Sequence, residues 1–214
     1  MGAGAVTGRI IETDADVQNG VTYLGKICPR MAFAYTQTGP LPLRRKPDGF
    51  AELLSAIVSQ QVSVASARSI WGRMKDARLT GPRKINAASD DDLRAVGLSR
   101  QKIRYARALA GAGIKFNDLR DAPTDKVIAT LTEVSGIGVW TAEIYAMFSL
   151  GRADVFAAGD LALQEAARVL YDLPDRPKDR DLRAMAEAWS PWRSVAARQL
   201  WAFYRVAKNR DGVL

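Results

Sequence analysis

Apolar residues recur at helical spacing along almost the whole of this 214-residue chain. In Phe50–Gln61 and Val62–Ala77 they fall at intervals of three and four residues, which places them on one face of a helix. No segment alternates apolar and polar residues as a half-buried strand would, and no internal repeat is visible. We therefore predict an all-α protein of about nine or ten helices. The other expected helices are Ser89–Gly97, Ser99–Ala112, Thr124–Glu133, Val139–Leu150, Leu161–Tyr171, Asp179–Ala188 and Trp192–Lys208.

The composition excludes several classes of chemistry, because the chain has no His and a single Cys, Cys28. Catalytic triads with His, His-ligated metals, Cys-ligated iron–sulfur clusters, Cys zinc fingers and internal disulfides are ruled out. The 31 Lys and Arg residues outnumber the 23 Asp and Glu residues, which gives a net charge of +8. This surplus favours a polyanionic partner, because basic side chains release the counterions that surround a phosphate backbone.

The beginning of the chain, Met1–Thr7, has neither the basic region nor the apolar region of a signal peptide. No stretch reaches the ~18 uncharged apolar residues of a membrane-spanning helix. We therefore expect a cytoplasmic protein that has no membrane partner.

Two glycines, Gly136 and Gly138, flank Ile137 between two expected helices. Glycines at these positions permit a tight hairpin and a close approach to the backbone, and Ile137 can anchor the turn in the core. The second helix would then begin with outward N–H groups and a dipole that favours an anion such as phosphate. The hairpin alone fits an ordinary helix-ending glycine and short turn equally well.

The hairpin is one of four motifs, and the other three are Ser59–Ala65, Gly159-Asp160 and Trp189–Ser194. Together the four motifs resemble the helix–hairpin–helix DNA glycosylase superfamily, and within it the 3-methyladenine DNA glycosylase II family. The resemblance covers about Phe50 to Tyr204. It implies two helical lobes that flank a cleft, one at 42–152 and the other at 1–41 plus 153–214. Only some 45 residues precede the matched region, so we expect a compact member without the extra N-terminal β-domain of larger relatives.

The resemblance implies that Asp160 is the catalytic residue, because it matches the aspartate that this family places about twenty residues after the hairpin. A fixed carboxylate lowers the energy of the positive charge that develops on deoxyribose as the N-glycosidic bond breaks. Asp160 also stands where a helix begins, so we expect it to cap the N–H groups of Ala162 or Leu163. Asp154 is the nearby rival carboxylate, and we expect it on a solvated loop.

The resemblance places Trp140, Tyr145, Phe148 and Trp201 in the pocket for the flipped base. Family members that also cut the strand carry Lys at the position of Trp140, because a Lys amine forms a Schiff base with the sugar. Trp140 cannot do so, which implies a monofunctional enzyme with water as the nucleophile. The bland interpretation of Trp140 and Trp201 is core packing.

Gln61, with its neighbour Gln60, matches the family's wedge, which fills the gap that a flipped nucleotide leaves in the stack. The alternative is a pair of polar residues at a helix end. A basic helix face at Arg100, Arg104 and Arg107, with Lys102 beside it, fits either contact with DNA or simple solvation.

The residues expected to bind DNA phosphate are Gly136, Ile137, Gly138, Thr141, Arg100 and Lys102. The resemblance also raises a monovalent cation held by the main-chain carbonyls of Thr132, Val134 and Ile137. No other cofactor is expected.

The residues and the resemblance together predict a monomeric, monofunctional glycosylase that excises alkylated purines from double-stranded DNA. One alternative is a helix–hairpin–helix module that binds DNA without catalysis. The other is a glycosylase for oxidised or mismatched bases.

Overall fold

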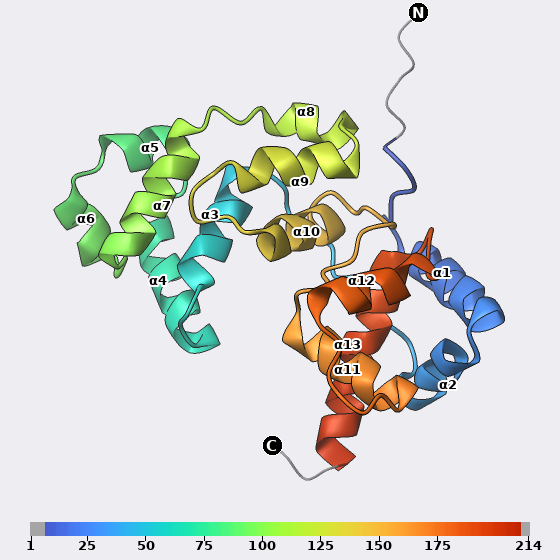
Figure 1. The fold of residues 1–214 in the computed structure, drawn as a ribbon. Helices are drawn as coiled ribbons and strands as arrows, with labels where there is room; N and C mark the ends of the chain where they lie inside the picture. Colours follow the sequence, from blue (N-terminus) through green and yellow to red (C-terminus); the bar gives the residue numbers. More distant parts are fainter. Residues whose placement is uncertain (1–6, 211–214) are drawn as a thin grey trace, which may run out of the picture. The chain divides into compact units, whose positions relative to one another are not determined.

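Helices dominate residues 7–210, the part of the chain that the computed structural model describes (Figure 1). These residues form 13 α-helices and no β-strand, with an isolated antiparallel bridge between Ile10 and Arg152. The all-α prediction is therefore confirmed, although it gave too few helices. Residues 1–6 of the segment tested for a signal peptide lie outside the described residues.

The described residues divide into two compact units. The first consists of Lys46–Tyr145, and the second joins Thr7–Arg45 to the residues from Ala146 onward. The lobe boundaries expected from the sequence, 42–152 and 1–41 plus 153–214, stay a prediction, as does the cleft.

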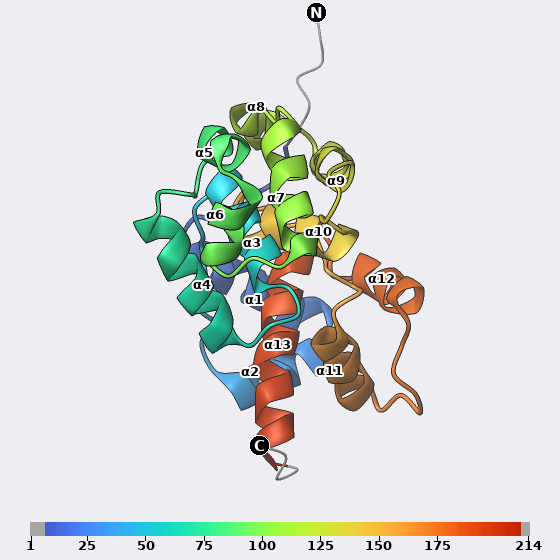
Figure 2. The same cartoon turned by 90° about the vertical axis from the view of Figure 1, so that its left-hand side faces the viewer.

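In the first unit, α7 packs against α3, α5 and α6, and α3 in turn packs against α4. Figures 1 and 2 show α5 and α6 beside α7 in both views. The apolar face of α7 is buried at Ile103, Ala106 and Leu109. The helices of this unit are α3 (Phe50–Ser59), α4 (Val64–Asp76), α5 (Pro82–Ala87), α6 (Asp90–Ala95), α7 (Arg100–Gly111), α8 (Phe116–Asp121), α9 (Thr124–Thr132) and α10 (Val139–Phe148), which continues into the second unit.

Serine side chains set the start of three of these helices, because each hydroxyl accepts a hydrogen bond from an otherwise unpaired N–H of the first turn. Ser63, Ser89 and Ser99 do so for α4, α6 and α7. The predicted starts at Ser89 and Ser99 are confirmed. The predicted start at Val62 is wrong, because Ser63 caps a helix that begins at Val64.

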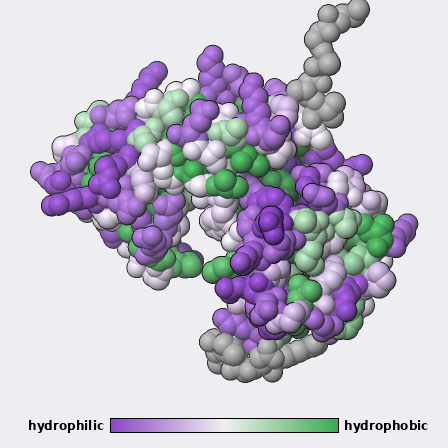
Figure 3. Space-filling view, in the orientation of Figure 1, coloured by the Kyte–Doolittle hydropathy of each residue, from purple (hydrophilic) through white to green (hydrophobic). Residues whose placement is uncertain are grey.

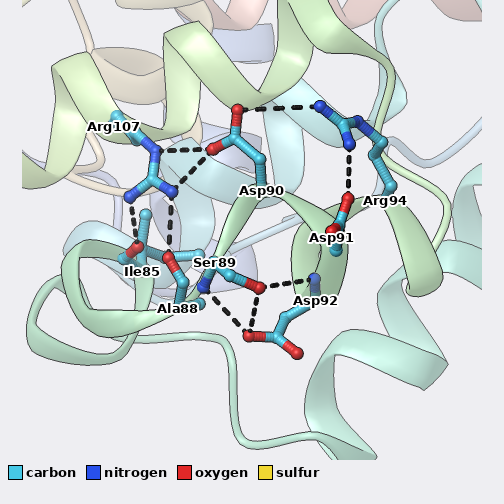
Figure 4. A network of polar contacts seen from close by, with 8 residues as sticks. All are labelled: Ile85, Ala88, Ser89, Asp90, Asp91, Asp92, Arg94 and Arg107. Carbon is cyan, nitrogen blue, oxygen red and sulfur yellow. Dashed lines mark hydrogen bonds and ion pairs between the residues drawn. The ribbon is translucent and has the colours of Figure 1, made fainter.

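Arg107 links α7 to α5 and α6, as Figure 4 shows. Its guanidinium donates to the carbonyls of Ile85 (3.1 Å) and Ala88 (2.9 Å) and pairs with Asp90 at 2.7 Å. The carbonyls close the end of α5, and the carboxylate begins α6. Arg107 is therefore a structural residue, and the predicted basic face contracts to exposed side chains such as Arg104.

In the second unit, α13 packs against α1, α2 and α11, and α12 packs on α11. The sequence analysis missed α1 and α2. Thr13 and Asp16 form a reciprocal capping box at the start of α1, and Pro29 occupies the first turn of α2. The helices of this unit are α1 (Asp14–Ile27), α2 (Pro29–Thr38), α11 (Leu161–Tyr171), α12 (Asp179–Glu187) and α13 (Arg193–Arg210).

The surface carries few large apolar residues. On the face drawn in Figure 3, hydrophilic and intermediate residues predominate, and hydrophobic residues reach the surface in small patches. Among residues 7–210, no helix is both long enough and apolar enough to cross a membrane.

Replacing Arg107 by Gln should destabilise the first unit, because two carbonyls and the Asp90 carboxylate would lose their donors. We expect the free energy of unfolding to fall by about 1–3 kcal/mol, measured by urea denaturation. Arg104→Gln is the matched control, because this exposed side chain lies on the same helix, and it should change stability by less than about 0.5 kcal/mol. Equal stability of the two variants would contradict the assignment of Arg107.

Candidate functional site

The carboxylate of Asp160 lies at the start of α11, where its Oδ1 accepts three hydrogen bonds. Two come from the main-chain N–H groups of Ala162 (2.9 Å) and Leu163 (3.1 Å). The third comes from the indole Nε1 of Trp201 on α13, at 3.1 Å. The predicted capping role is therefore confirmed. The third bond fixes the carboxylate against a second helix.

The loop that delivers Asp160 is held from below by α11 itself. The buried side-chain amide of Gln164 donates to the carbonyl of Ala158 at 2.9 Å, and the N–H of Asp160 donates to Ala157 at 3.0 Å. Ala157 and Ala158 are fully buried, whereas Asp160 is partly exposed. The local sequence thus presents one carboxylate at the surface on a fixed turn.

Aromatic rings adjoin this carboxylate within the second unit. The ring of Trp201 lies 5.8 Å from that of Phe148, with an angle of 31° between the planes. Phe148 also contacts Arg198, whose guanidinium lies over the ring, 4.7 Å from its centre. Phe148 is buried and Trp201 is partly exposed. The structure therefore brings three predicted site residues together: Asp160, Trp201 and Phe148.

Asp154, the rival carboxylate, is held in a structural ion pair. The expectation that Asp154 lies on a solvated loop is wrong, because its side chain is partly buried. Asp154 pairs with Arg193 at 2.7 Å and accepts a hydrogen bond from the Ser190 hydroxyl at 2.8 Å. Burial raises the pKa of Asp154, but the hydrogen bonds from Arg193 and Ser190 outweigh burial and leave the pKa lowered. Asp154 therefore stabilises the start of α13.

The predicted hairpin connects α9 to α10 in the first unit. The N–H of Ile137 donates to the carbonyl of Val134 at 3.0 Å, and both side chains are buried. The carbonyl of Gly138 accepts the N–H of Ala142, so α10 begins directly after Gly138. Its first N–H groups have no partner within the helix and are directed beyond its N-terminus.

The structure requires glycine at only one of the two hairpin positions. Gly136 has a φ of 96°, and a Cβ there would lie 2.3 Å from the ring of Tyr105. Gly138 is exposed, and a Cβ there would meet nothing within 4 Å. The packing of the chain thus demands glycine at 136, whereas at 138 it leaves open space in front of the helix.

Gln60 and Gln61 form the turn after α3, beside this hairpin. The side-chain amide of Gln60 donates to the carbonyl of Gly136 at 2.9 Å. Gln61 is exposed and has a φ of 54°, in the left-handed region that few residues other than glycine adopt. Gln60 therefore ties the turn to the hairpin, and Gln61 is the residue that protrudes. Both line a pocket of about 590 Å³ with Lys102, Tyr105 and the hairpin glycines.

Lys102 is buried, and its ammonium group donates to the carbonyl of Val58 at 2.6 Å, near the end of α3. Burial lowers the pKa of Lys102. This bond gives Lys102 a structural role in the same pocket, and its predicted contact with DNA phosphate stays a prediction. Arg100, two residues before Lys102 on α7, is exposed.

The first turns of α10 carry the remaining predicted residues of the first unit. Trp140 is 46% exposed, whereas Thr141 is buried, so Thr141 offers an anion its main-chain N–H alone. Tyr145 is buried, and its hydroxyl accepts the N–H of Gly49 at 2.8 Å. Burial is the main cause that raises the pKa of Tyr145 to about 12. Tyr145 therefore holds the start of α3.

Among the described residues, no three His, Cys, Asp or Glu side chains gather as a metal site. The predicted cation would depend on main-chain oxygens. Thr132 ends α9, where the last carbonyls lack helical donors, and the Val134 carbonyl keeps a second lone pair beyond its bond to Ile137. These hard oxygen donors fit a monovalent cation.

The sequence analysis missed the long-range contacts that organise the site. The bond from Gln60 to Gly136 spans 76 residues and gave no local signal. It also overlooked Arg44 and Arg45, although the basic run Arg44-Arg45-Lys46 was visible.

Comparison with known proteins agrees with this geometry. Residues 54–193 match the family model described as HhH-GPD superfamily base excision DNA repair protein. The curated protein DNA-3-methyladenine glycosylase 1 of Schizosaccharomyces pombe is 32% identical over 171 residues, which cover 76% of this chain and 75% of that protein.

Solved structures show the same similarity. The Schizosaccharomyces pombe 3-methyladenine DNA glycosylase Mag1, in complex with abasic DNA, is 28% identical and has a TM-score of 0.75, over 86% of this chain and 95% of that one. A DNA-3-methyladenine glycosidase from Bacillus halodurans is 34% identical and has a TM-score of 0.76, over 92% and 91% of the two chains. The family model spans well over half of the sequence, and this chain therefore belongs to the HhH-GPD superfamily of base excision DNA repair proteins.

Proposed function

We propose that this protein is a monofunctional DNA glycosylase that excises alkylated purines of the 3-methyladenine kind from duplex DNA. Relatives at 32% and 34% identity are named DNA-3-methyladenine glycosylase and glycosidase. The complex of the Schizosaccharomyces pombe enzyme with abasic DNA supports DNA as the partner. We extend the proposal to a monomer that acts in the cytoplasm on double-stranded DNA.

The observation that carries the proposal is the Asp160 carboxylate, fixed by three N–H donors from two helices. When the purine leaves with the electrons of the N-glycosidic bond, positive charge develops on the deoxyribose. A carboxylate that is already in place stabilises this charge without reorganising. Water then adds to the sugar carbon and releases a proton, which leaves an abasic site.

The residues proposed to contact the flipped base are aromatic, and each unit contributes two of them. Trp140 is the most exposed of the proposed set and is suited to stack on it. An alkylated purine is cationic, so the face of the indole also attracts its charge. Within the second unit, Trp201 and Phe148 would form a wall beside Asp160. Within the first unit, Tyr145 would be a buried support.

The hairpin would anchor the DNA backbone. The open space at Gly138 and the first N–H groups of α10, including that of Thr141, suit one phosphate group, and Ile137 holds the turn in the core. Arg100 and Lys102 complete the proposed contacts. The carbonyls of Thr132, Val134 and Ile137 would hold a monovalent cation, which would add positive charge near the phosphate.

The test of catalysis is Asp160→Asn. The remaining oxygen can still accept the N–H groups of Ala162, Leu163 and Trp201, so the fold should persist. Release of bases from methylated duplex DNA should slow by at least about a hundredfold, because the charge opposite the sugar is lost. Asp179→Asn is the control, since this carboxylate lies near Gly159 but pairs with Arg183. Near-normal excision by Asp160→Asn would exclude the assignment.

The test of the wedge is a pair of variants, Gln61→Ala and Gln61→Gly. Both remove the side chain that would fill the gap, whereas Gly also relieves the left-handed backbone. Both should slow excision of a fully paired lesion by about tenfold and should affect a mismatched lesion less, because a weakened pair costs less to open. An equal effect on paired and mismatched lesions would contradict the wedge.

The test of the monofunctional mechanism is borohydride, which traps a Schiff base between a Lys amine and the sugar. With Trp140 at the position where a Lys would act, we expect no covalent complex with damaged DNA, and strand breaks should require alkali. A trapped complex that disappears in the Lys102→Met variant would instead identify Lys102 as a nucleophile.

A further inference from the structure

Four arginines gather in the second unit. Arg198, on α13, is buried, and its guanidinium donates to the carbonyls of Ser194 (2.9 Å) and Leu43 (3.3 Å). The second bond fixes the segment that continues with Arg44 and Arg45. Arg205, two turns along α13 from Arg198, interacts electrostatically with Arg44.

Gly151 admits Arg45 to this cluster. A Cβ at Gly151 would lie 2.1 Å from the guanidinium nitrogen Nη1 of Arg45, so no larger residue fits without displacing it. The backbone at Arg44 has a φ of 53°, in the left-handed region that residues other than glycine rarely adopt. The fold therefore brings these cations together at a cost in backbone strain.

No carboxylate in residues 7–210 forms an ion pair with any of the four arginines, although Arg30 and Arg193 of the same unit are paired with Asp172 and Asp154. Burial, and then the like charges of Arg44 and Arg45, lower the pKa of Arg198 to about 10. Burial and the charge of Arg205 also lower the pKa of Arg44. Within the chain this cluster is repulsive, and an anion would relieve it.

The position of the cluster identifies the anion. Arg198 and Arg205 stand three residues before and four residues after Trp201, which places all three on one face of α13. Along the axis they are about 4.5 and 6 Å from Trp201, whose indole holds Asp160. In DNA, each sugar is joined directly to two phosphates, so a sugar at Asp160 brings its phosphates within reach of long arginine side chains.

We propose that Arg44, Arg45 and Arg205, supported by buried Arg198, bind a phosphodiester group next to the nucleotide whose base is flipped. This site rests on the proposed role of Asp160 and is separate from the hairpin contact. Guanidinium groups suit a phosphate site, because one guanidinium can donate two parallel hydrogen bonds to two oxygens of the same phosphate. A contact on the adjacent phosphate would hold the sugar against the carboxylate.

The experiment compares the wild-type protein with Arg44→Gln/Arg205→Gln on duplexes that carry a stable abasic analogue. In one duplex the linkages next to the analogue are neutral methylphosphonates. The wild type should bind the neutral duplex about tenfold more weakly than the normal one. The double variant should bind the normal duplex about tenfold more weakly and lose nothing further on the neutral one. The logarithm of the binding constant falls linearly with the logarithm of the salt concentration, and the double variant should reduce the steepness of this line by about one to two, or ~0.9 for each lost phosphate contact.

Arg180→Gln is the matched control, because Arg180 is an exposed arginine of the same unit outside the cluster, and it should behave as wild type. Melting temperatures would establish that all variants are folded. The proposal is overturned if the double variant remains as sensitive to the neutral linkages as the wild type, or if sensitivity appears at distant linkages alone. Binding reports on this site independently of catalysis, so a wild type that binds but excises nothing would contradict the proposed function instead.

Discussion

The hydrogen bond from the Trp201 indole to Asp160 is the contact on which the geometry of the proposed site depends. It joins the N-terminus of α11 to the middle of α13, and α13 in turn packs against α1 and α2. The two main-chain donors of an ordinary helix cap would fix the carboxylate relative to α11 alone. Here a donor from a second helix adds to the two main-chain donors, so one side chain can cap α11 and present a fixed negative charge.

In the first unit, most of the polar side chains that the sequence analysis singled out form hydrogen bonds with main-chain groups at turns and helix ends. Gln60 bonds to the hairpin, Lys102 to the end of α3, Tyr145 to its start, and Arg107 to α5 and α6. What these bonds leave exposed is a smaller set, notably Gln61, Gly138 and Trp140. The braced turns therefore allow a few residues to protrude in fixed positions, as a protein that must enter a DNA duplex requires.

The surplus of positive charge is divided in the same way. Arg30, Arg107 and Arg193 are paired with carboxylates and stabilise helix ends or loops. The cluster around Arg198 has no such pairing in the described chain. Net charge therefore says little about where an anion binds, and the pairing of individual arginines says much more.

The sequence by itself determined the features that depend on neighbours along the chain. Helical periodicity gave the all-α class and nine of the helices, and Ser89, Ser99 and Asp160 marked helix starts because a cap bonds within three residues. It missed α5 and α8, which have six residues each and are too short to show a period, and it missed α1, whose capping box uses Asp rather than Glu. The order of four motifs was enough to predict the family.

Only the tertiary structure decided which polar groups remain available. The bonds from Trp201 to Asp160, from Gln60 to Gly136 and from Arg198 to Leu43 join residues 41, 76 and 155 positions apart. No local pattern encodes them, because they form when helices distant in sequence pack together. The same packing placed Tyr105 against Gly136 and left Gly138 open. Residue type therefore indicates what a side chain can do, and its packed neighbours decide what it does.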